Sequence, residues 1–298
     1  MAEDATRIAY QGEPGAFSEA AAMRFGGAVE LLPCRSFEDV FASVNLAAAS
    51  HGVLPIENSI GGSIHRNYDL LLEHELPIVG EVEIQVVHHL LAMPGVSRDR
   101  LRRVYSHPQG LAQCERFLRT LTDVEIIATY DTAGSAKLVA DERLEDAAAI
   151  ASARAGEVFG LTPLASGIQD FDDNLTRFIV IGRRPIGPAV ADKTTIVFSV
   201  PNEPGSLFKA LSVFALRGVD LTKLESRPIP GRPWEYLFYA DLAASRDELP
   251  CARALGHLAE FAPTLRTLGS YASWKTHEEW LPDPFEVAST PEAAAPRS

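Results

Sequence analysis

Polar residues gather where apolar, strand-like runs pass into helix-like runs. The richest of these junctions are Gln11–Gly15, Glu57–Ser63, Ser106–Gln109 and Asp131–Ser135. A helix N-terminus offers unpaired N–H groups and the positive end of the helix dipole. Ligands of open α/β sheets bind at the carboxyl ends of strands, where such junctions lie. Several junctions around one cleft would therefore hold carboxylates without a basic surface.

Each junction alone has a plainer interpretation as a helix cap, because Ser, Thr, Asn and Asp commonly cap helices. A cap needs only one side-chain oxygen, however, and these junctions also carry Glu57, Asn58 and Gln109. A further polar run ends in Thr176 and Arg177 at the start of an apolar strand. The spacing fits an arginine that pairs with a neighbouring aspartate equally as well as one that binds an anion.

The elements that carry these junctions alternate between strand and helix from Arg7 to about residue 185. This alternation predicts an α/β fold with helices on the faces of a parallel or mixed sheet. A long strand-like stretch, Ile78–Met93, interrupts the pattern and is predicted to carry the chain from one lobe to another. We expect a two-lobed catalytic domain over residues 1–184. Its lobes are approximately residues 7–82 plus 176–184, and 83–175.

A second domain is predicted beyond a linker rich in Pro and Gly, residues 185–193. Residues 194–273 show the element order βαββαβ, which is typical of a ferredoxin-like domain. Residues 274–298 end in a run rich in Pro, Ala, Ser and Glu, and we predict a disordered tail there.

The composition excludes several classes of partner. The chain has 298 residues and a formal net charge of −13, which argues against nucleic acid as a partner. No apolar run approaches the roughly 20 residues of a membrane helix, so no membrane partner is expected. Three widely spaced cysteines and an acidic N-terminus without an apolar segment predict a cytoplasmic protein with reduced thiols and no signal peptide.

Motifs for metals and nucleotides are absent from the sequence. There is no G-x-G-x-x-G after a strand, no Walker-A loop, no H-E-x-x-H, no C-x-x-C and no G-x-S-x-G. His88 and His89 are adjacent and would face opposite ways in a strand, so we interpret them as ordinary strand histidines. The sequence therefore predicts no metal site and no cofactor.

Taken together, the junctions resemble the prephenate dehydratase family, which includes the arogenate dehydratases. The matching segments, in the family's order, are Tyr10–Glu19, Leu54–Ser59, Ser106–Gln109 and Thr176–Phe178. The second domain resembles an ACT regulatory domain, with Glu203–Leu207 at its first turn and Glu225–Pro228 after its second strand. The resemblance covers about residues 7 to 273.

The resemblance implies a catalytic region like the type II periplasmic binding proteins, with the substrate between the lobes. It implies a cofactor-free loss of water and carbon dioxide from prephenate, giving phenylpyruvate in phenylalanine biosynthesis. It also implies a homodimer or homotetramer whose paired ACT domains bind L-phenylalanine as a feedback inhibitor. Ala16 stands where a threonine is common in the family, and Asp131 where a serine is common. At both positions the chain is similar to plant arogenate dehydratases. Prephenate and arogenate both stay open as substrates.

The resemblance makes Thr176 the essential catalytic residue. A threonine hydroxyl is a weak acid, so we expect it to act as an aimed hydrogen-bond donor or relay. Glu57 or His107 could supply the proton, directly or through water, although His107 fits a helix start with a structural partner equally well. Arg177 is expected to grip the side-chain carboxylate of the substrate. The remaining substrate-binding residues are expected to be Asn58, Ser59, Ser106, Gln109, Thr132 and Phe178.

The effector site is expected at the first turn and second strand of the ACT domain. The residues assigned to phenylalanine binding are Gly205, Ser206, Leu207, Glu225, Ser226 and Arg227. One alternative is a ferredoxin-like domain used only for assembly. Another is a non-catalytic, two-lobed binding protein that senses an amino acid. The run from Thr176 to Phe178 favours the enzyme.

Overall fold

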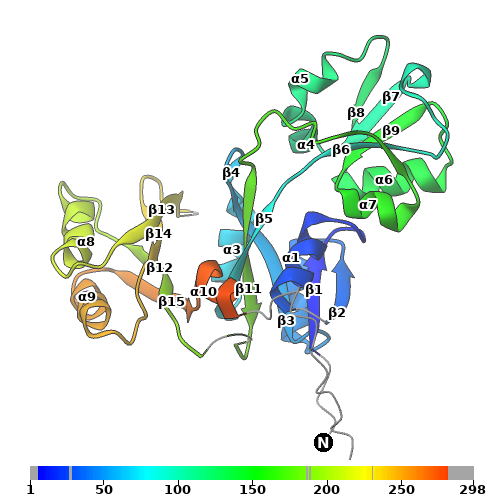
Figure 1. The fold of residues 1–298 in the computed structure, drawn as a ribbon. Helices are drawn as coiled ribbons and strands as arrows, with labels where there is room; N and C mark the ends of the chain where they lie inside the picture. Colours follow the sequence, from blue (N-terminus) through cyan, green and yellow to red (C-terminus); the bar gives the residue numbers. More distant parts are fainter. Residues whose placement is uncertain (1–5, 27–28, 186, 188, 230, 281–298) are drawn as a thin grey trace, which may run out of the picture.

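The computed structural model describes residues 6–280 except 27, 28, 186, 188 and 230. The chain forms three sheets, each with its own helices (Figure 1). The first sheet has the order β2-β1-β3-β11-β5, with β4 paired to β3. Its elements are β1 (Arg7–Gln11), α1 (Phe17–Gly26), β2 (Glu30–Cys34), α2 (Phe37–Asn45), β3 (His51–Asn58), β4 (Gly62–Ser63), α3 (His65–Glu73), β5 (Ile78–Gln85) and β11 (Leu175–Gly182). Strand β11 runs antiparallel to β3 and β5, so the sheet is mixed.

The second sheet has the order β10-β6-β9-β7-β8. Its elements are β6 (His89–Ala92), the 3-10 turn Arg98–Arg100, β7 (Arg103–Ser106), α4 (Pro108–Ala112), α5 (Glu115–Leu118), β8 (Glu125–Ala128), α6 (Thr132–Asp141), β9 (Ala147–Ala151), α7 (Ala153–Phe159) and β10 (Thr162–Ser166). The chain enters this lobe between β5 and β6 and returns between β10 and β11. The two-lobed α/β fold predicted for this part of the chain is confirmed.

The third sheet forms the C-terminal domain and has the order β13-β14-β12-β15. Its elements are β12 (Lys193–Ser199), α8 (Ser206–Ala215), β13 (Leu221–Pro228), β14 (Tyr236–Leu242), α9 (Leu249–Ala259) and β15 (Thr264–Tyr271). This is the predicted βαββαβ order. Apolar residues of α8 and α9, among them Phe214 and Leu258, pack on the inner face of the sheet around Phe198.

The predicted disordered tail is wrong over its first residues, which form helix α10 (Trp274–Trp280). Trp274 and His277 are buried, and the His277 ring stacks on Phe25 of α1 with centroids 4.3 Å apart. Trp274 and His277 therefore pack this short helix onto the first lobe. The rest of the tail, residues 281–298, lies outside the described residues. No helix in the described part of the chain is both long and apolar enough to cross a membrane.

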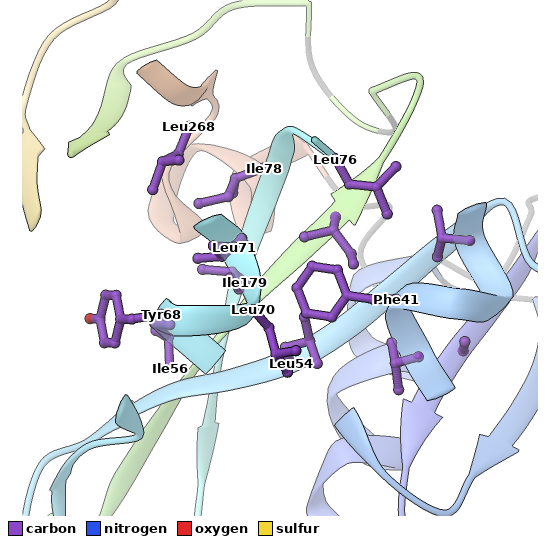
Figure 2. Packing of buried hydrophobic residues seen from close by; sticks show 14 of the residues in the cluster. Phe41, Leu54, Ile56, Tyr68, Leu70, Leu71, Leu76, Ile78, Ile179 and Leu268 are labelled. Carbon is purple, nitrogen blue, oxygen red and sulfur yellow. The ribbon is translucent and has the colours of Figure 1, made fainter. Parts of the chain in front are cut away.

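The first lobe and the C-terminal domain share one hydrophobic core. Leu70, Leu71 and Ile78 of the lobe belong to the same buried cluster as Tyr239 and Leu268 of the domain. Figure 2 shows Leu268 beside Ile78 within this cluster. The two backbones come so close that a Cβ at Gly269 would stand 2.1 Å from the Ile78 carbonyl oxygen. The domain is therefore packed directly onto strand β5 rather than tethered by the linker alone.

All three cysteines are free and buried. Burial raises the pKa of Cys114 to about 12 and that of Cys251 to about 11. Both therefore stay protonated at neutral pH, and a protonated thiol is a poor nucleophile.

Candidate active site

A cavity of about 510 Å³ lies between the two lobes. The first lobe contributes Gln11, Phe17, Glu38, Asn58, Thr176 and Phe178 to its lining, and the second contributes His88, His107, Gln109, Gln113, Asp131 and Thr132. All four polar junctions of the sequence therefore reach one cavity. Of the residues expected in the catalytic site, it brings together Thr176, His107, Asn58, Gln109, Thr132 and Phe178.

Thr176 and Asn58 form a pair on neighbouring strands of the first sheet. Thr176 on β11 lies opposite Asn58 on β3. The Asn58 Nδ2 donates to Thr176 Oγ1 at 3.0 Å and to Asn174 Oδ1 at 2.7 Å. Thr176 Oγ1 thus accepts a hydrogen bond, and among the described residues none accepts one from it. Its hydroxyl hydrogen is therefore left to point to a ligand in the cavity.

Asn58 is itself held from both lobes. Its Oδ1 accepts from the amides of Ile60 at 3.1 Å and Gly61 at 2.7 Å, and from Gln113 Nε2 at 3.5 Å. Gln113 Oε1 lies 2.9 Å from His88 Nε2, and because an amide oxygen only accepts, this His88 nitrogen carries the hydrogen. Burial lowers the pKa of His88, which keeps the ring neutral. A chain of hydrogen bonds thus joins the second lobe to the hydroxyl of the first.

His107 and Asp131 cap helices and line the cavity at the same time. His107 Nδ1 accepts from the Gln109 amide at 3.2 Å, at the start of α4. Asp131 Oδ1 accepts from the Gly134 amide at 2.5 Å, at the start of α6. Burial lowers the pKa of His107, and the charge of Asp131 opposes this shift. Burial also raises the pKa of the Asp131 carboxyl, the Gly134 amide opposes the shift, and the charge of Glu13 adds to it.

The lining contains no lysine or arginine in the described part of the chain. Instead, the first residues of α1, α2 and α6 meet there, including Phe17, Phe37 and Thr132. The donors there are uncharged side chains and those helix-start amides that are not already capped, as the Gly134 amide is by Asp131 and the Asp39 amide by Ser36. Such an arrangement binds carboxylates through N–H groups and helix dipoles.

Arg177 and Glu57 lie outside the cavity, and the roles expected for them are corrected. Successive strand residues face opposite sides of a sheet, so Thr176 faces the cavity while Arg177 faces the C-terminal domain. Its Nη1 contacts Asp241 Oδ2 at 2.5 Å. Glu57 Oε1 contacts Lys223 Nζ at 2.8 Å. Neither side chain is placed to grip a substrate or to supply its proton.

Two serines expected to bind substrate are engaged by the backbone instead. Ser59 Oγ donates to the Asp173 carbonyl at 2.9 Å and accepts from the Leu175 amide at 3.0 Å. Ser106 is fully buried, and its Oγ donates to the Ile150 carbonyl at 2.7 Å. Both hydroxyls hold the junction loops together and do not line the cavity, which corrects their assignment.

Several lining residues were missed from the sequence. These are Gln11, Phe17, Glu38, His88, Gln113 and Tyr130. Gln113 follows Gln109 by four residues, a helical spacing that places both on one side. That spacing was a usable signal. His88 was interpreted as a strand histidine, but it lies in the loop between β5 and β6.

The residues expected to bind phenylalanine occupy two parts of the C-terminal domain. Gly205 has φ +83° and precedes α8, with Ser206 and Leu207 in its first turn. On β13, Glu225 accepts from Ser63 Oγ at 2.7 Å and Arg227 donates to Asp69 at 2.8 Å, so both face the first lobe. Ser226 between them is exposed. Within the described residues, no hydrogen bond or ion pair joins the two parts.

Comparisons with known proteins agree with this geometry. A family model described as prephenate dehydratase matches residues 8–186, which is the two-lobed region. The chain belongs to the prephenate dehydratase family. An ACT domain model matches residues 194–249 of this dehydratase, so the C-terminal domain is an ACT domain.

Curated relatives of this dehydratase include plant enzymes. "Arogenate dehydratase/prephenate dehydratase 2, chloroplastic" of Arabidopsis thaliana is 52% identical over 278 residues, covering 89% of this chain and 72% of the relative. Arogenate dehydratase 2 of Petunia hybrida is 50% identical over 283 residues, covering 90% and 72%.

Two solved structures share the whole architecture of this dehydratase. The prephenate dehydratase of Arthrobacter aurescens in complex with L-Phe is 32% identical, with a TM-score of 0.83 and coverage of 91% of each chain. GqqA, described as a novel type of quorum quenching acylase, is 36% identical, with a TM-score of 0.82 and coverage of 90% of this chain and 98% of its own.

Proposed function

We propose that this protein catalyses the decarboxylating dehydration of prephenate to phenylpyruvate, as a carbon–oxygen lyase without a cofactor. The observation that carries the proposal is the Thr176 hydroxyl in the cavity between the lobes. It accepts from Asn58 at 3.0 Å, which leaves its hydrogen for the substrate. A donor fixed in this way is suited to a departing hydroxyl group.

The reaction breaks two bonds of the cyclohexadiene ring. The C–C bond to the ring carboxylate breaks and releases carbon dioxide, and its electron pair makes the ring aromatic. The C–O bond breaks at the same time, and the oxygen leaves as water once it has taken a proton. Negative charge develops on this oxygen, so the hydrogen bond from Thr176 is stronger in the transition state than in the ground state.

His107 is the remaining candidate for the proton donor, because Glu57 faces the ACT domain. The lowered pKa of His107 makes its protonated ring a stronger acid, although fewer rings are protonated at neutral pH. The carboxylates of the substrate are held by amides at the helix starts, in the absence of lysine and arginine from the described lining. This leaves the carboxylate that departs as carbon dioxide without a strong ion pair to slow its release.

Arogenate, which carries an amino group in place of the keto group, is the second candidate substrate. Asp131 lines the cavity, and its Oδ2 has no hydrogen-bond partner in the described structure. A carboxylate of this kind can pair with an ammonium group. The names of the plant relatives support the same alternative.

The test is to incubate the purified chain with prephenate and, separately, with arogenate. We expect phenylpyruvate from the first or phenylalanine from the second, and the ratio of kcat/KM values identifies the preferred substrate. Turnover of neither would reject the enzyme and favour a non-catalytic binding protein.

Feedback inhibition by L-phenylalanine and assembly into a homodimer or homotetramer complete the proposal. The ACT domain and the L-Phe complex of the Arthrobacter aurescens relative support the inhibitor. Calorimetric titration with L-phenylalanine tests it, and light scattering tests the assembly. The cytoplasm is our proposed location, from the buried free thiols, and fractionation of cells that make the protein is its test.

A further inference from the structure

Strands β3 and β11 carry two neighbouring residue pairs that face opposite sides of the sheet. Thr176 lies opposite Asn58, and Arg177 lies opposite Glu57. The first pair lines the cavity. The second pair faces the ACT domain, where Lys223 contacts Glu57 and Asp241 contacts Arg177. The two pairs share backbone, so neither can shift alone.

Three cations and three carboxylates form an ionic cluster around the second pair, and Lys223 also lies 3.8 Å from Glu225 at its edge. Arg177, Glu57 and Glu81 come from the first lobe, and Lys193, Lys223 and Asp241 come from the ACT domain. The side chains of Glu81 and Asp241 are only 2% and 4% exposed. We call these six residues the interdomain cluster. Its buried position limits the screening of these ion pairs by solvent.

Asp241 is held firmly within the ACT sheet. Its Oδ1 accepts from Thr195 Oγ1 at 2.7 Å, and Thr195 in turn lies 2.7 Å from the Tyr271 hydroxyl. Its Oδ2 then points to Arg177 Nη1 at 2.5 Å. Because the ACT domain holds one oxygen of this carboxylate, any movement of the domain is passed to Arg177 through the second oxygen.

The backbone beside Arg177 is irregular. The pairing of β11 with β3 changes register between Arg177 and Phe178, as at a β-bulge. Such an irregularity interrupts the ladder that would otherwise hold the strand. The side-chain contacts of Arg177 and Glu57 therefore add to the hold of β11 on β3 at this point, while the pairing of β11 with β5 stays regular across it.

We propose that Asp241 and Lys223 of the ACT domain are positioning residues for the dehydration. By holding Arg177 and Glu57, they keep the Thr176 hydroxyl and the Asn58 amide in register on the other face of the same strands. This rests on the proposed function, in which Thr176 is the donor to the leaving group. A displacement of a reacting group by about 1 Å can cost about 10²-fold in rate. The interdomain cluster thus links the position of the ACT domain to the rate of the reaction.

The experiment compares two variants that each remove one carboxylate charge from an ion pair between the domains. Asp241→Asn acts on the interdomain cluster. Asp69→Asn is the matched control, because it breaks the pair between Asp69 of α3 and Arg227 of β13, neither of which belongs to β3 or β11. We expect Asp241→Asn to lower kcat about tenfold while KM changes less than about threefold, since the cavity lining is intact. Asp69→Asn should leave kcat within about twofold of wild type.

Two further variants keep the test decisive. Asp241→Glu retains the charge and should recover most of kcat. Lys223→Gln removes the contact between the ACT domain and Glu57. It tests the same positioning role if thermal melting shows that Asp241→Asn does not fold. We expect it to lower kcat with little change in KM.

Several results would overturn the positioning role while wild type remains active. They are an unchanged kcat in both Asp241→Asn and Lys223→Gln, an equal loss in Asp69→Asn, or a rise in KM in place of the fall in kcat. If wild type turned over neither prephenate nor arogenate, the proposed function itself would fail, which is a distinct outcome.

Discussion

The two faces of the β3–β11 ladder differ in how they use charged side chains. On one face, the interdomain cluster pairs arginine and lysine with buried carboxylates and leaves little to bind. On the other face, the described lining of the cavity has no cation, and neutral groups such as Asn58, Gln109 and Thr176 supply its donors. Cations are used where two domains must stay together, whereas the cavity that a ligand enters and leaves is lined by uncharged donors beside the carboxyl groups of Glu38 and Asp131.

This difference explains how an acidic chain can accept an anionic substrate. A full ion pair with the departing carboxylate would stabilise the ground state and oppose decarboxylation. Amides at helix starts bind anions more weakly and keep their directions fixed by the helix. Arg177, although next to Thr176 in the chain, therefore lies on the face that packs against the ACT domain, where it forms a lasting ion pair with Asp241.

The largest effect should come from removing the aimed hydroxyl on the cavity face. Thr176→Val keeps the shape of the side chain and removes the donor, and we expect kcat to fall by about 10²–10³-fold. Steady-state kinetics measures this, with Thr162→Val on the exposed strand β10 as the control. A variant with wild-type kcat would show that Thr176 is not the donor.

A slightly smaller loss is expected when the partner of that hydroxyl is altered. Asn58→Asp replaces the donating amide with a carboxylate oxygen, which would accept the Thr176 hydrogen in place of the substrate. We expect kcat to fall by about 10²-fold, with the fold retained by circular dichroism. Unaltered turnover would mean that Asn58 does not direct the hydroxyl.

The opposite face should respond in stability and not in substrate affinity. Arg177→Gln leaves Asp241 without its cation, whereas Glu81 keeps its ion pair with Lys193. Breaking a buried ion pair costs about 3–5 kcal/mol. Denaturant unfolding should show this loss, while KM stays near that of wild type. A large rise in KM with unchanged stability would restore Arg177 to the substrate site and break the contrast between the faces.

The convergence of the junction loops was predictable from sequence, and the direction of the strand residues was not. Alternating strands and helices place junctions at the carboxyl ends of strands, and Asn58, Gln109 and Asp131 do meet there. Adjacent residues of a strand must point to opposite faces of the sheet. Which of the two faces the cavity is decided by the packing of the ACT domain, which contacts Arg177 and leaves Thr176 on the cavity side. Lys223 and Asp241, the partners of Glu57 and Arg177, belong to another domain, and no local sequence pattern predicts these contacts.

The burial of His88 and of helix α10 was also not predicted from the sequence. His88 appeared to be an unremarkable strand residue, yet it is 1% exposed and bonded to Gln113 in the cavity wall. Helix α10 was hidden by the Pro- and Ala-rich sequence that follows it. In both places the decisive contacts come from elements distant in the chain.

The smallest effect we expect is a pH dependence that again separates the faces. Burial lowers the pKa of His88 below its usual value, so the unfolded chain binds a proton that the folded one does not. Stability is therefore complete above the unfolded value of about 6.5 and falls as the pH drops below it.

Thermal melting between pH 7 and pH 5 should show this fall, and it should be shallower in His88→Gln, which has no titrating ring. Burial also lowers the pKa values of four other histidines, which contribute to the slope that remains: His51, His89, His107 and His277. In the described structure Asp241 contacts Arg177 and Thr195 and no histidine, so Asp241→Asn should shift the whole curve without changing its slope. Equal slopes in wild type and His88→Gln would show that His88 does not contribute to the acid sensitivity.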